Sequence, residues 1–201
     1  MRVDSVQSAG LLTRLGPPQH RNVFCIYRRE VVIAFVSKAR DQPEAWEPEP
    51  LQSVTEAALR TAFSVVSEEL VVPQLDKVEW HNRDFLGWVH PAGHRAYLLH
   101  ESPIDGSLRG TVLRRSSWMG KRRSMEMCNW CYHMHQAGGT AMFTVTRRGT
   151  GGRHIIGNVV CKDLDCSLRI RNLVEPRSYF AETMHLPARI WRMQRAMHKW
   201  L

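Results

Sequence analysis

The sequence of 201 residues contains no long apolar run, and its longest stretch that could enter a membrane, Val31–Val36, spans six residues. A membrane-spanning helix needs roughly 20 apolar residues, and the core of a secretion signal needs about 7–15 of them close to the N-terminus. The stretch is too short for either purpose. The sequence therefore predicts a cytoplasmic protein.

Acidic residues are scarce in the second half of the chain. Residues 107–201 contain 17 Lys and Arg but only 5 Asp and Glu, whereas residues 1–106 contain 11 and 14. The second half thus carries a formal net charge of +12, against +9 for the whole chain. A surplus of this kind indicates an anionic partner such as a nucleic acid, an acidic protein surface or a membrane surface.

The residue patterns of familiar catalytic sites are missing as well. The Gly-rich loop 148–153 lacks the Gly-Lys-Ser/Thr ending of a phosphate-binding loop. The chain has no compact Ser/His/Asp group or pair of carboxylates, and residues 166–173 contain no histidine that could serve as the base of a metal-dependent nuclease. We therefore expect a binding protein that is not an enzyme and has no small-molecule substrate.

Five cysteines are present, an odd number that makes a poor disulfide framework, and four of them lie in the last third of the chain: Cys25, Cys128, Cys131, Cys161 and Cys166. The last four form a Cys-x2-Cys pair and a Cys-x4-Cys pair, each close enough for both thiolates to bind one ion. Four thiolates make a closed tetrahedral site for a single structural zinc ion. The alternatives are buried free cysteines, or a redox-active Cys-x-x-Cys pair that leaves Cys161 and Cys166 unexplained.

Two histidines, His133 and His135, follow Cys131 closely. Because four thiolates already complete a zinc coordination shell, we expect these histidines to face solvent or to lie behind the ligands rather than to bind the metal.

Short apolar runs separated by turn-forming residues predict two β-hairpins. The first joins residues 95–101 to 110–114 around Asp105-Gly106, and the second joins 141–147 to 155–160. Helical patterns flank them. Ser53 and Glu56 resemble a capping box that opens a helix ending at Pro73, and residues 187–201 form an amphipathic helix with Ile190, Met193, Met197 and Trp200 on one face. That apolar face is explained by docking on the domain, so we expect no membrane partner.

These elements predict an α+β fold in which a helix and β-hairpin region is followed by a treble-clef zinc finger with a C-terminal helix. A treble clef consists of a zinc knuckle, a hairpin and a helix whose start supplies the last ligand, here Cys166. We expect three regions: an N-terminal extension and linker at 1–50, an α/β region at 51–120, and the treble-clef domain at 121–201.

Basic residues surround the predicted metal site in three separate segments. We expect the following arginines to form a partner-binding face: Arg122, Arg123, Arg147, Arg148, Arg153, Arg169 and Arg171. The alternative is an ordinary solvated surface, with one or two cations offsetting the formal −2 charge of Zn²⁺ with four thiolates. One or two positive charges are few compared with the surplus of +12 in this half of the chain.

The two cysteine motifs, within Met127–Cys131 and Gly157–Ser167, resemble the FBP-type C-terminal treble-clef zinc-finger family, and the resemblance extends over about residues 53–201. That family includes elongation factor G-binding proteins of the FusB type, which protect translation from fusidic acid. The resemblance implies a non-enzymatic protein that binds elongation factor G and modulates its release from the ribosome, with fusidic acid tolerance as one outcome. The alternative is a zinc finger that binds RNA or the ribosome directly through the same basic face.

Overall fold

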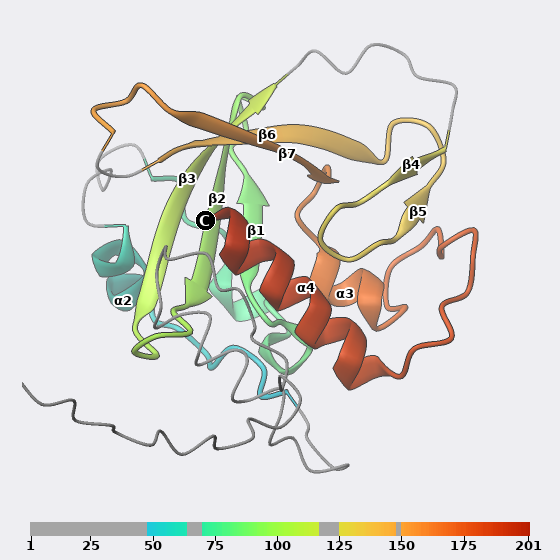
Figure 1. Cartoon of the computed structure of the whole chain (residues 1–201). Coiled ribbons are helices and arrows are strands. Elements are labelled where there is room, and N and C mark those ends of the chain that lie inside the picture. Colours follow the sequence, from blue (N-terminus) through green and yellow to red (C-terminus); the bar gives the residue numbers. More distant parts are fainter. Residues whose placement is uncertain (1–47, 64–69, 117–124, 148–149) are drawn as a thin grey trace, which may run out of the picture.

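The computed structural model describes residues 48–63, 70–116, 125–147 and 150–201 (Figure 1). Its centre is a five-stranded antiparallel sheet with the strand order β1-β2-β3-β6-β7. Within the described residues, no helix combines the length and the apolarity needed to cross a bilayer. The sheet strands are β1 (Leu86–Val89), β2 (Arg95–Glu101), β3 (Leu108–Ser116), β6 (Thr140–Thr146) and β7 (Ile155–Cys161).

Both predicted hairpins are present. In the first, β2 pairs with β3 so that Leu99 lies opposite Gly110, and the turn between them contains Gly106 at a φ of 68°. In the second, β6 pairs with β7 so that Phe143 lies opposite Asn158. Strand β3 is longer than predicted because it continues beyond the first hairpin and pairs with β6.

The pairing of β3 with β6 joins the two halves of the described chain. Arg115 of β3 lies opposite Phe143 of β6, so strands from both sides of residue 120 belong to one sheet. The same hydrophobic core also contains Phe85 and Leu98 from the first half and Trp130 from the second. The zinc-finger region and the preceding α/β region therefore share a sheet and a core, while a domain boundary near residue 120 stays a prediction.

Strand β2 shows how the sheet separates two cores. Successive side chains of a strand point to opposite faces of the sheet. Accordingly, Ala96 and Leu98 belong to the core that includes the cysteines and the C-terminal helix, whereas Tyr97 and Leu99 belong to a second core. The second core is completed by the N-terminal helix α2 (Glu56–Ala62) and its neighbours. Because both faces are covered, five consecutive residues of β2 are buried.

Helix α2 begins two residues later than the sequence predicted. Its N-cap is Thr55, whose side-chain oxygen accepts a hydrogen bond from the backbone N–H of Ala58 at 3.3 Å. Glu56 consequently lies in the first turn, where it pairs with Arg60, instead of closing a capping box with Ser53. The described helix ends at Ala62, and residues 64–69 of the predicted longer helix lie outside the described residues.

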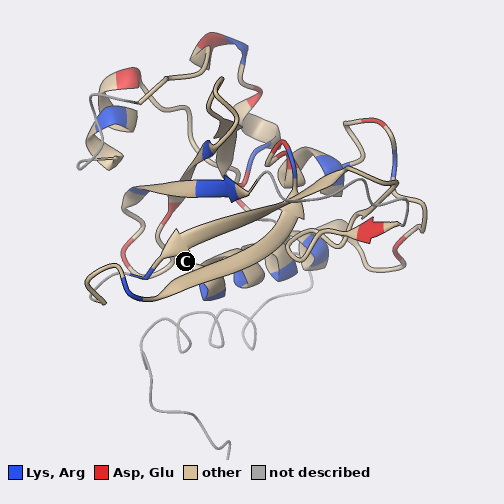
Figure 2. Cartoon of the chain, turned by 90° about the horizontal axis from the view of Figure 1, so that it is seen from above, with Lys and Arg blue, Asp and Glu red and all other residues tan. Residues whose placement is uncertain are grey.

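Helix α4 (Leu186–Trp200) covers the cysteine-containing core, as predicted. The side chains of Ile190, Met193, Met197 and Trp200 are buried on one face, and the Trp200 ring contacts the Trp130 ring at a centroid distance of 5.6 Å. The opposite side carries repeated Lys and Arg residues along the helix (Figure 2).

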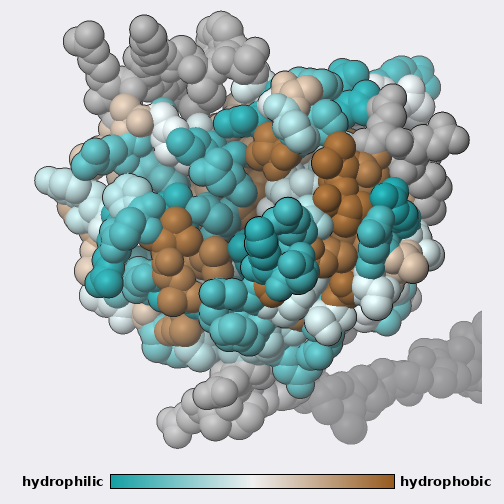
Figure 3. Space-filling view, turned by 180° about the vertical axis from the view of Figure 1, so that it is seen from behind, coloured by the Kyte–Doolittle hydropathy of each residue, from teal (hydrophilic) through white to brown (hydrophobic). Residues whose placement is uncertain are grey.

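On the far side of the molecule from the view of Figure 1, apolar residues form separate patches with hydrophilic residues between them (Figure 3).

A close approach of Phe63 to Gly110 fixes helix α2 on strand β3. A Cβ atom at position 110 would lie 2.4 Å from Cγ of the Phe63 ring, which is itself buried. We expect Gly110→Ala to lower the free energy of unfolding by about 1–3 kcal/mol, because overpacking displaces the ring. Urea denaturation measures this. Gly157→Ala is the matched control, since the nearest atom to its Cβ would be the flexible Met142 sulfur at 3.0 Å. Equal losses in the two variants would contradict the account.

Candidate metal centre

The first cysteine pair lies in a tight turn between two short strands, β4 (Glu126–Met127) and β5 (Met134–His135). The backbone N–H of Tyr132 donates to the Cys128 carbonyl at 2.9 Å, and Tyr132 adopts a left-handed φ of 59°. This turn aims the backbone N–H groups of Trp130 and Cys131 at Cys128 Sγ, at 3.4 and 3.5 Å. Backbone donors of this kind stabilise a thiolate.

The second pair comes from the end of β7 and the start of helix α3 (Cys166–Ile170). Between Cys161 and Cys166 the chain turns through Leu164, which has a left-handed φ of 55° and whose N–H donates to the Cys161 carbonyl. Gly87 of β1 lies against this turn, since a Cβ atom at position 87 would be 2.5 Å from Leu164 Cβ. The first strand of the sheet thus packs directly on the turn between Cys161 and Cys166.

The four sulfur atoms lie within 4.8 Å of one another, and all four cysteines are buried. Two of the sulfur–sulfur distances are 3.7 Å, for Cys128 and Cys166, and 3.4 Å, for Cys131 and Cys161. A zinc ion with four Zn–S bonds of about 2.3 Å requires sulfur atoms about 3.8 Å apart. The donor set and its spacing therefore fit a tetrahedral Zn²⁺ ion, and a shell of four thiolates marks the site as structural.

A sequence model of the FBP C-terminal treble-clef zinc-finger family matches residues 56–201 of the chain. The chain belongs to this family. The match confirms the predicted resemblance, fold and structural zinc ion. The match extends from helix α2 to Leu201, so it covers the α/β region as well as the cysteine motifs.

Among solved structures, the chain is similar to that of the fusidic acid resistance protein FusC, with a TM-score of 0.47 and 17% sequence identity. The similarity covers 59% of this chain and 53% of FusC, so it spans about half the length of that protein. No curated protein matches the chain.

Two of the predicted partner-binding arginines of this zinc finger form ion pairs within the fold. Both nitrogen ends of the Arg171 guanidinium donate to the Asp84 carboxylate, at 2.7 and 2.9 Å. Arg169 donates to Asp165 at 2.8 Å and is itself buried. Burial lowers the pKa of Arg169, but the hydrogen bond and the negative charge of Asp165 outweigh that effect and raise it. Both side chains hold elements of the fold together, and a role of theirs in partner binding stays a prediction.

Of the other five predicted arginines, two lie within the described residues and three lie outside them. Arg147 and Arg153 flank the tip of the β6–β7 hairpin and are exposed, with Arg147 N–H donating to the His154 carbonyl at its base. Arg122, Arg123 and Arg148 lie outside the described residues. The structure therefore brings two of the seven together at an exposed loop.

His135 contacts the metal centre without belonging to it. Its Nε2 lies 3.3 Å from Cys161 Sγ, yet His135 is not one of the residues that could share the ion with the four cysteines. Burial, followed by the nearby His133, lowers the pKa of His135 to about 4. His133 and His135 are both buried, so the solvent-facing alternative is wrong, and His135 lies behind the ligand Cys161 as expected.

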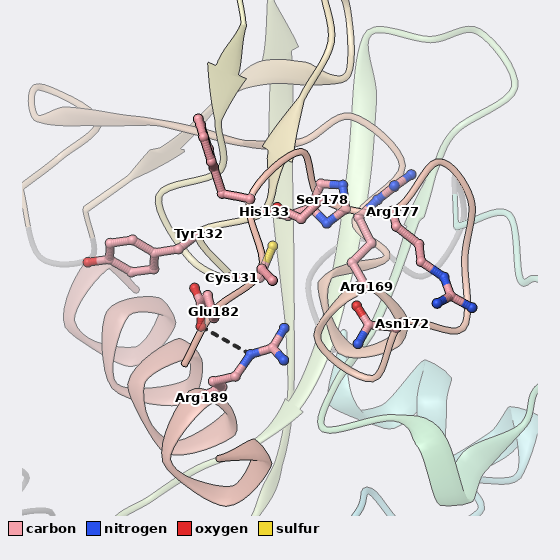
Figure 4. Close-up of a pocket in the computed structure, with 11 residues that line it drawn as sticks. Cys131, Tyr132, His133, Arg169, Asn172, Arg177, Ser178, Glu182 and Arg189 are labelled. Atoms are coloured by element: carbon pink, nitrogen blue, oxygen red, sulfur yellow. Dashed lines mark ion pairs between the residues drawn. The ribbon is translucent and has the colours of Figure 1, made fainter. Parts of the chain in front are cut away.

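A cavity of about 210 Å³ opens beside the zinc knuckle, between helix α3, helix α4 and the segment that connects them. Figure 4 shows His133, Arg169 and Asn172 on one side of it, and Glu182 with Arg189 on the other. Arg189 pairs with Glu182 at 3.1 Å, and Arg192 pairs with the same carboxylate at 2.5 Å. The guanidinium groups around the cavity are thus largely balanced by carboxylates.

Three aromatic residues, which we call the aromatic rim, lie at this cavity: Tyr132, Tyr179 and Phe180. Tyr132 and Phe180 line it, and the Tyr179 ring packs edge-on against Phe180 at a centroid distance of 5.0 Å. The two latter side chains are 64% and 56% exposed, and the Arg192 guanidinium lies 4.2 Å from the Tyr132 ring centre. Sequence reasoning missed this surface, although adjacent aromatics in a polar segment were a usable signal.

Proposed function

We propose that this protein binds elongation factor G through its zinc finger and modulates the factor's release from the ribosome, with tolerance to fusidic acid as a consequence. Membership of the FBP C-terminal treble-clef zinc-finger family supports the proposal, because the family resemblance implies this partner. The four-cysteine site would act by holding the surrounding surface in place, since a closed structural zinc shell leaves no position for a substrate.

The observation that carries the proposal is the aromatic rim. Large aromatic side chains and arginines are enriched where proteins bind one another, and a few of them supply most of the binding energy. Here Tyr179 and Phe180 are more than half exposed next to a cavity. Arg189 lines the same cavity, and Arg192 lies over the Tyr132 ring; both arginines pair with Glu182. Exposed rings around a hollow of this kind suit a protein partner that fills the hollow with a side chain.

The distribution of charge also favours a protein over RNA. Arg169 and Arg189 at the cavity are paired with carboxylates, so they offer little free charge to a phosphate backbone. Arg147 and Arg153 are exposed at the hairpin tip, where they can accelerate association with an acidic partner. Direct RNA or ribosome binding remains the alternative, and it requires that the exposed arginines carry most of the affinity.

Retention of elongation factor G on the immobilised, zinc-loaded full chain tests the proposal. Lysate is applied at moderate salt, with and without prior nuclease treatment, and bound elongation factor G is identified by mass spectrometry. We expect retention that survives the nuclease. Absence of the factor from folded, zinc-loaded protein would contradict the proposal, and retention that disappears with nuclease and falls steeply with salt would favour RNA binding.

Truncation of the aromatic rim separates binding from folding. We expect Tyr179→Ala and Phe180→Ala each to raise the Kd for elongation factor G on the order of 10–30-fold, because each removes a ring from the centre of the proposed interface. Both side chains are exposed, so the free energy of unfolding should change by less than about 0.5 kcal/mol. Ile104→Ala truncates an apolar side chain in the β2–β3 turn that is 51% exposed; it is the control and should leave the Kd unchanged.

A further inference from the structure

The zinc ligand Cys161 has a buried histidine as its neighbour. His135 Nε2 lies 3.3 Å from Cys161 Sγ, and the two residues are 3% and 0% exposed. A thiolate that binds zinc has no proton to donate, so a hydrogen bond between these atoms requires the proton on Nε2. The Nε2–H then points at the metal ligand.

The backbone of Gly139 holds the imidazole in this position. A Cβ atom at Gly139 would lie 2.3 Å from His135 Nδ1, so the ring lies directly on the Gly139 backbone. The Gly139 carbonyl in turn accepts a hydrogen bond from the backbone N–H of Lys162, the residue after Cys161. The His133 ring lies 4.4 Å from the His135 ring, centroid to centroid. The glycine thus fixes the ring relative to the ligand that the ring contacts.

Cys128, another ligand of the same site, also accepts hydrogen bonds at its sulfur. Its sulfur accepts hydrogen bonds from the backbone N–H groups of Trp130 and Cys131. At Cys161 a side chain provides a donor, so the contact can be altered by substitution without changing the backbone. Removal of a group that hydrogen-bonds to a metal ligand commonly lowers the metal affinity 10–100-fold.

We propose that His135 is a positioning residue of the zinc site, donating its Nε2–H to the Cys161 thiolate and thereby slowing zinc loss and reducing the reactivity of that sulfur. The hydrogen bond stabilises the charged form of the ligand and withdraws electron density from it. Gly139 contributes by leaving room for the ring. This inference rests on the zinc site alone and does not depend on the identity of the partner.

Two amide substitutions provide a matched test. In His135→Gln the side-chain N–H₂ can reach the place of Nε2, whereas in His135→Asn the same group is one methylene shorter and falls short of the sulfur. With the zinc-loaded full chain, we expect His135→Asn to release zinc to a chelator on the order of 10–100-fold faster than the unaltered protein, and His135→Gln to stay close to it. His133→Asn is the control, and it should behave as the unaltered protein does.

Two further readouts separate hydrogen bonding from packing. Alkylation of the zinc-loaded protein, mapped by mass spectrometry, should be faster at Cys161 in His135→Asn and unchanged at Cys128. In the Co²⁺-substituted protein, the sulfur-to-metal charge-transfer band should move to lower energy in His135→Asn and return in His135→Gln. Identical zinc release, alkylation and spectra for the Asn and Gln variants would overturn the inference, as would an equal effect of His133→Asn.

Discussion

Replacing Cys161 or Cys166 with serine will unfold the zinc finger and release helix α4 from the sheet. Binding of a structural zinc ion to a site of this kind contributes roughly 10–16 kcal/mol in apparent terms, which exceeds the stability of an ordinary domain. All four cysteines lie in the same core as Trp130, Met193 and Met197. Loss of the ion therefore removes the centre of that core and leaves buried thiols without their partner.

We expect three losses in these variants: the bound zinc, the near-ultraviolet circular dichroism of Trp130 and Trp200, and cooperative thermal unfolding. Treatment of the unaltered protein with a strong chelator should produce the same state. Cys25→Ser changes the one cysteine that is not a predicted ligand, so this variant should keep its zinc, its near-ultraviolet signal and its cooperative unfolding. A Cys161→Ser protein that unfolds cooperatively and is indifferent to chelator would show that the metal is not structural.

Substitution of Arg171 with alanine has the second largest expected effect, and the effect is on stability. The Asp84 side chain is 0% exposed and the Arg171 side chain 11% exposed, and their charged groups meet through two short hydrogen bonds. Removal of the arginine leaves a buried carboxylate without a counter-charge. We expect Arg171→Ala to lower the free energy of unfolding by about 3–5 kcal/mol, the range for a broken buried pair.

Arg109→Ala provides the matched control, because the same change there breaks a pair with Asp105 in which both side chains are at least 40% exposed. Exposed pairs contribute about 0–1 kcal/mol. Urea denaturation of both variants distinguishes the cases, and similar losses would contradict the assignment of Arg171 to the fold. The comparison also matters for binding experiments, since weaker binding by Arg171→Ala would report unfolding and not a lost contact with a partner.

The features that the sequence predicted well are those that depend on neighbouring residues. Both hairpins follow from apolar runs on either side of turn residues such as Asp105-Gly106, and the four-cysteine group follows from the spacing of two pairs. The start of helix α2 was predicted two residues too early, because Ser53 and Thr55 are both good N-caps and only the backbone path decides between them.

The features that the sequence did not reveal depend on residues far apart in the chain. Arg171 meets Asp84 across 87 positions, and His135 meets Cys161 across 26. Net charge identified the basic half of the chain but could not tell a paired arginine from a free one. For Arg169 a local signal existed, since Asp165 lies four residues earlier on the same helical turn.

The aromatic rim of the proposed interface is attached to the zinc knuckle. Tyr132 follows a zinc ligand directly, and the backbone N–H of Tyr179 donates to the Met134 carbonyl at 3.4 Å in the same knuckle. The rim is thereby attached to the metal site through the chain itself and through β5. A preorganised surface loses less conformational entropy on binding than a mobile one.

Calorimetric titration of purified elongation factor G into the zinc-loaded full chain tests the central claim most directly. The account predicts a saturable complex, and it predicts that a Tyr179→Ala/Phe180→Ala double variant with unchanged zinc content and thermal stability loses most of that affinity. Absence of a complex with folded, zinc-loaded protein would contradict the account, and so would full affinity in the double variant.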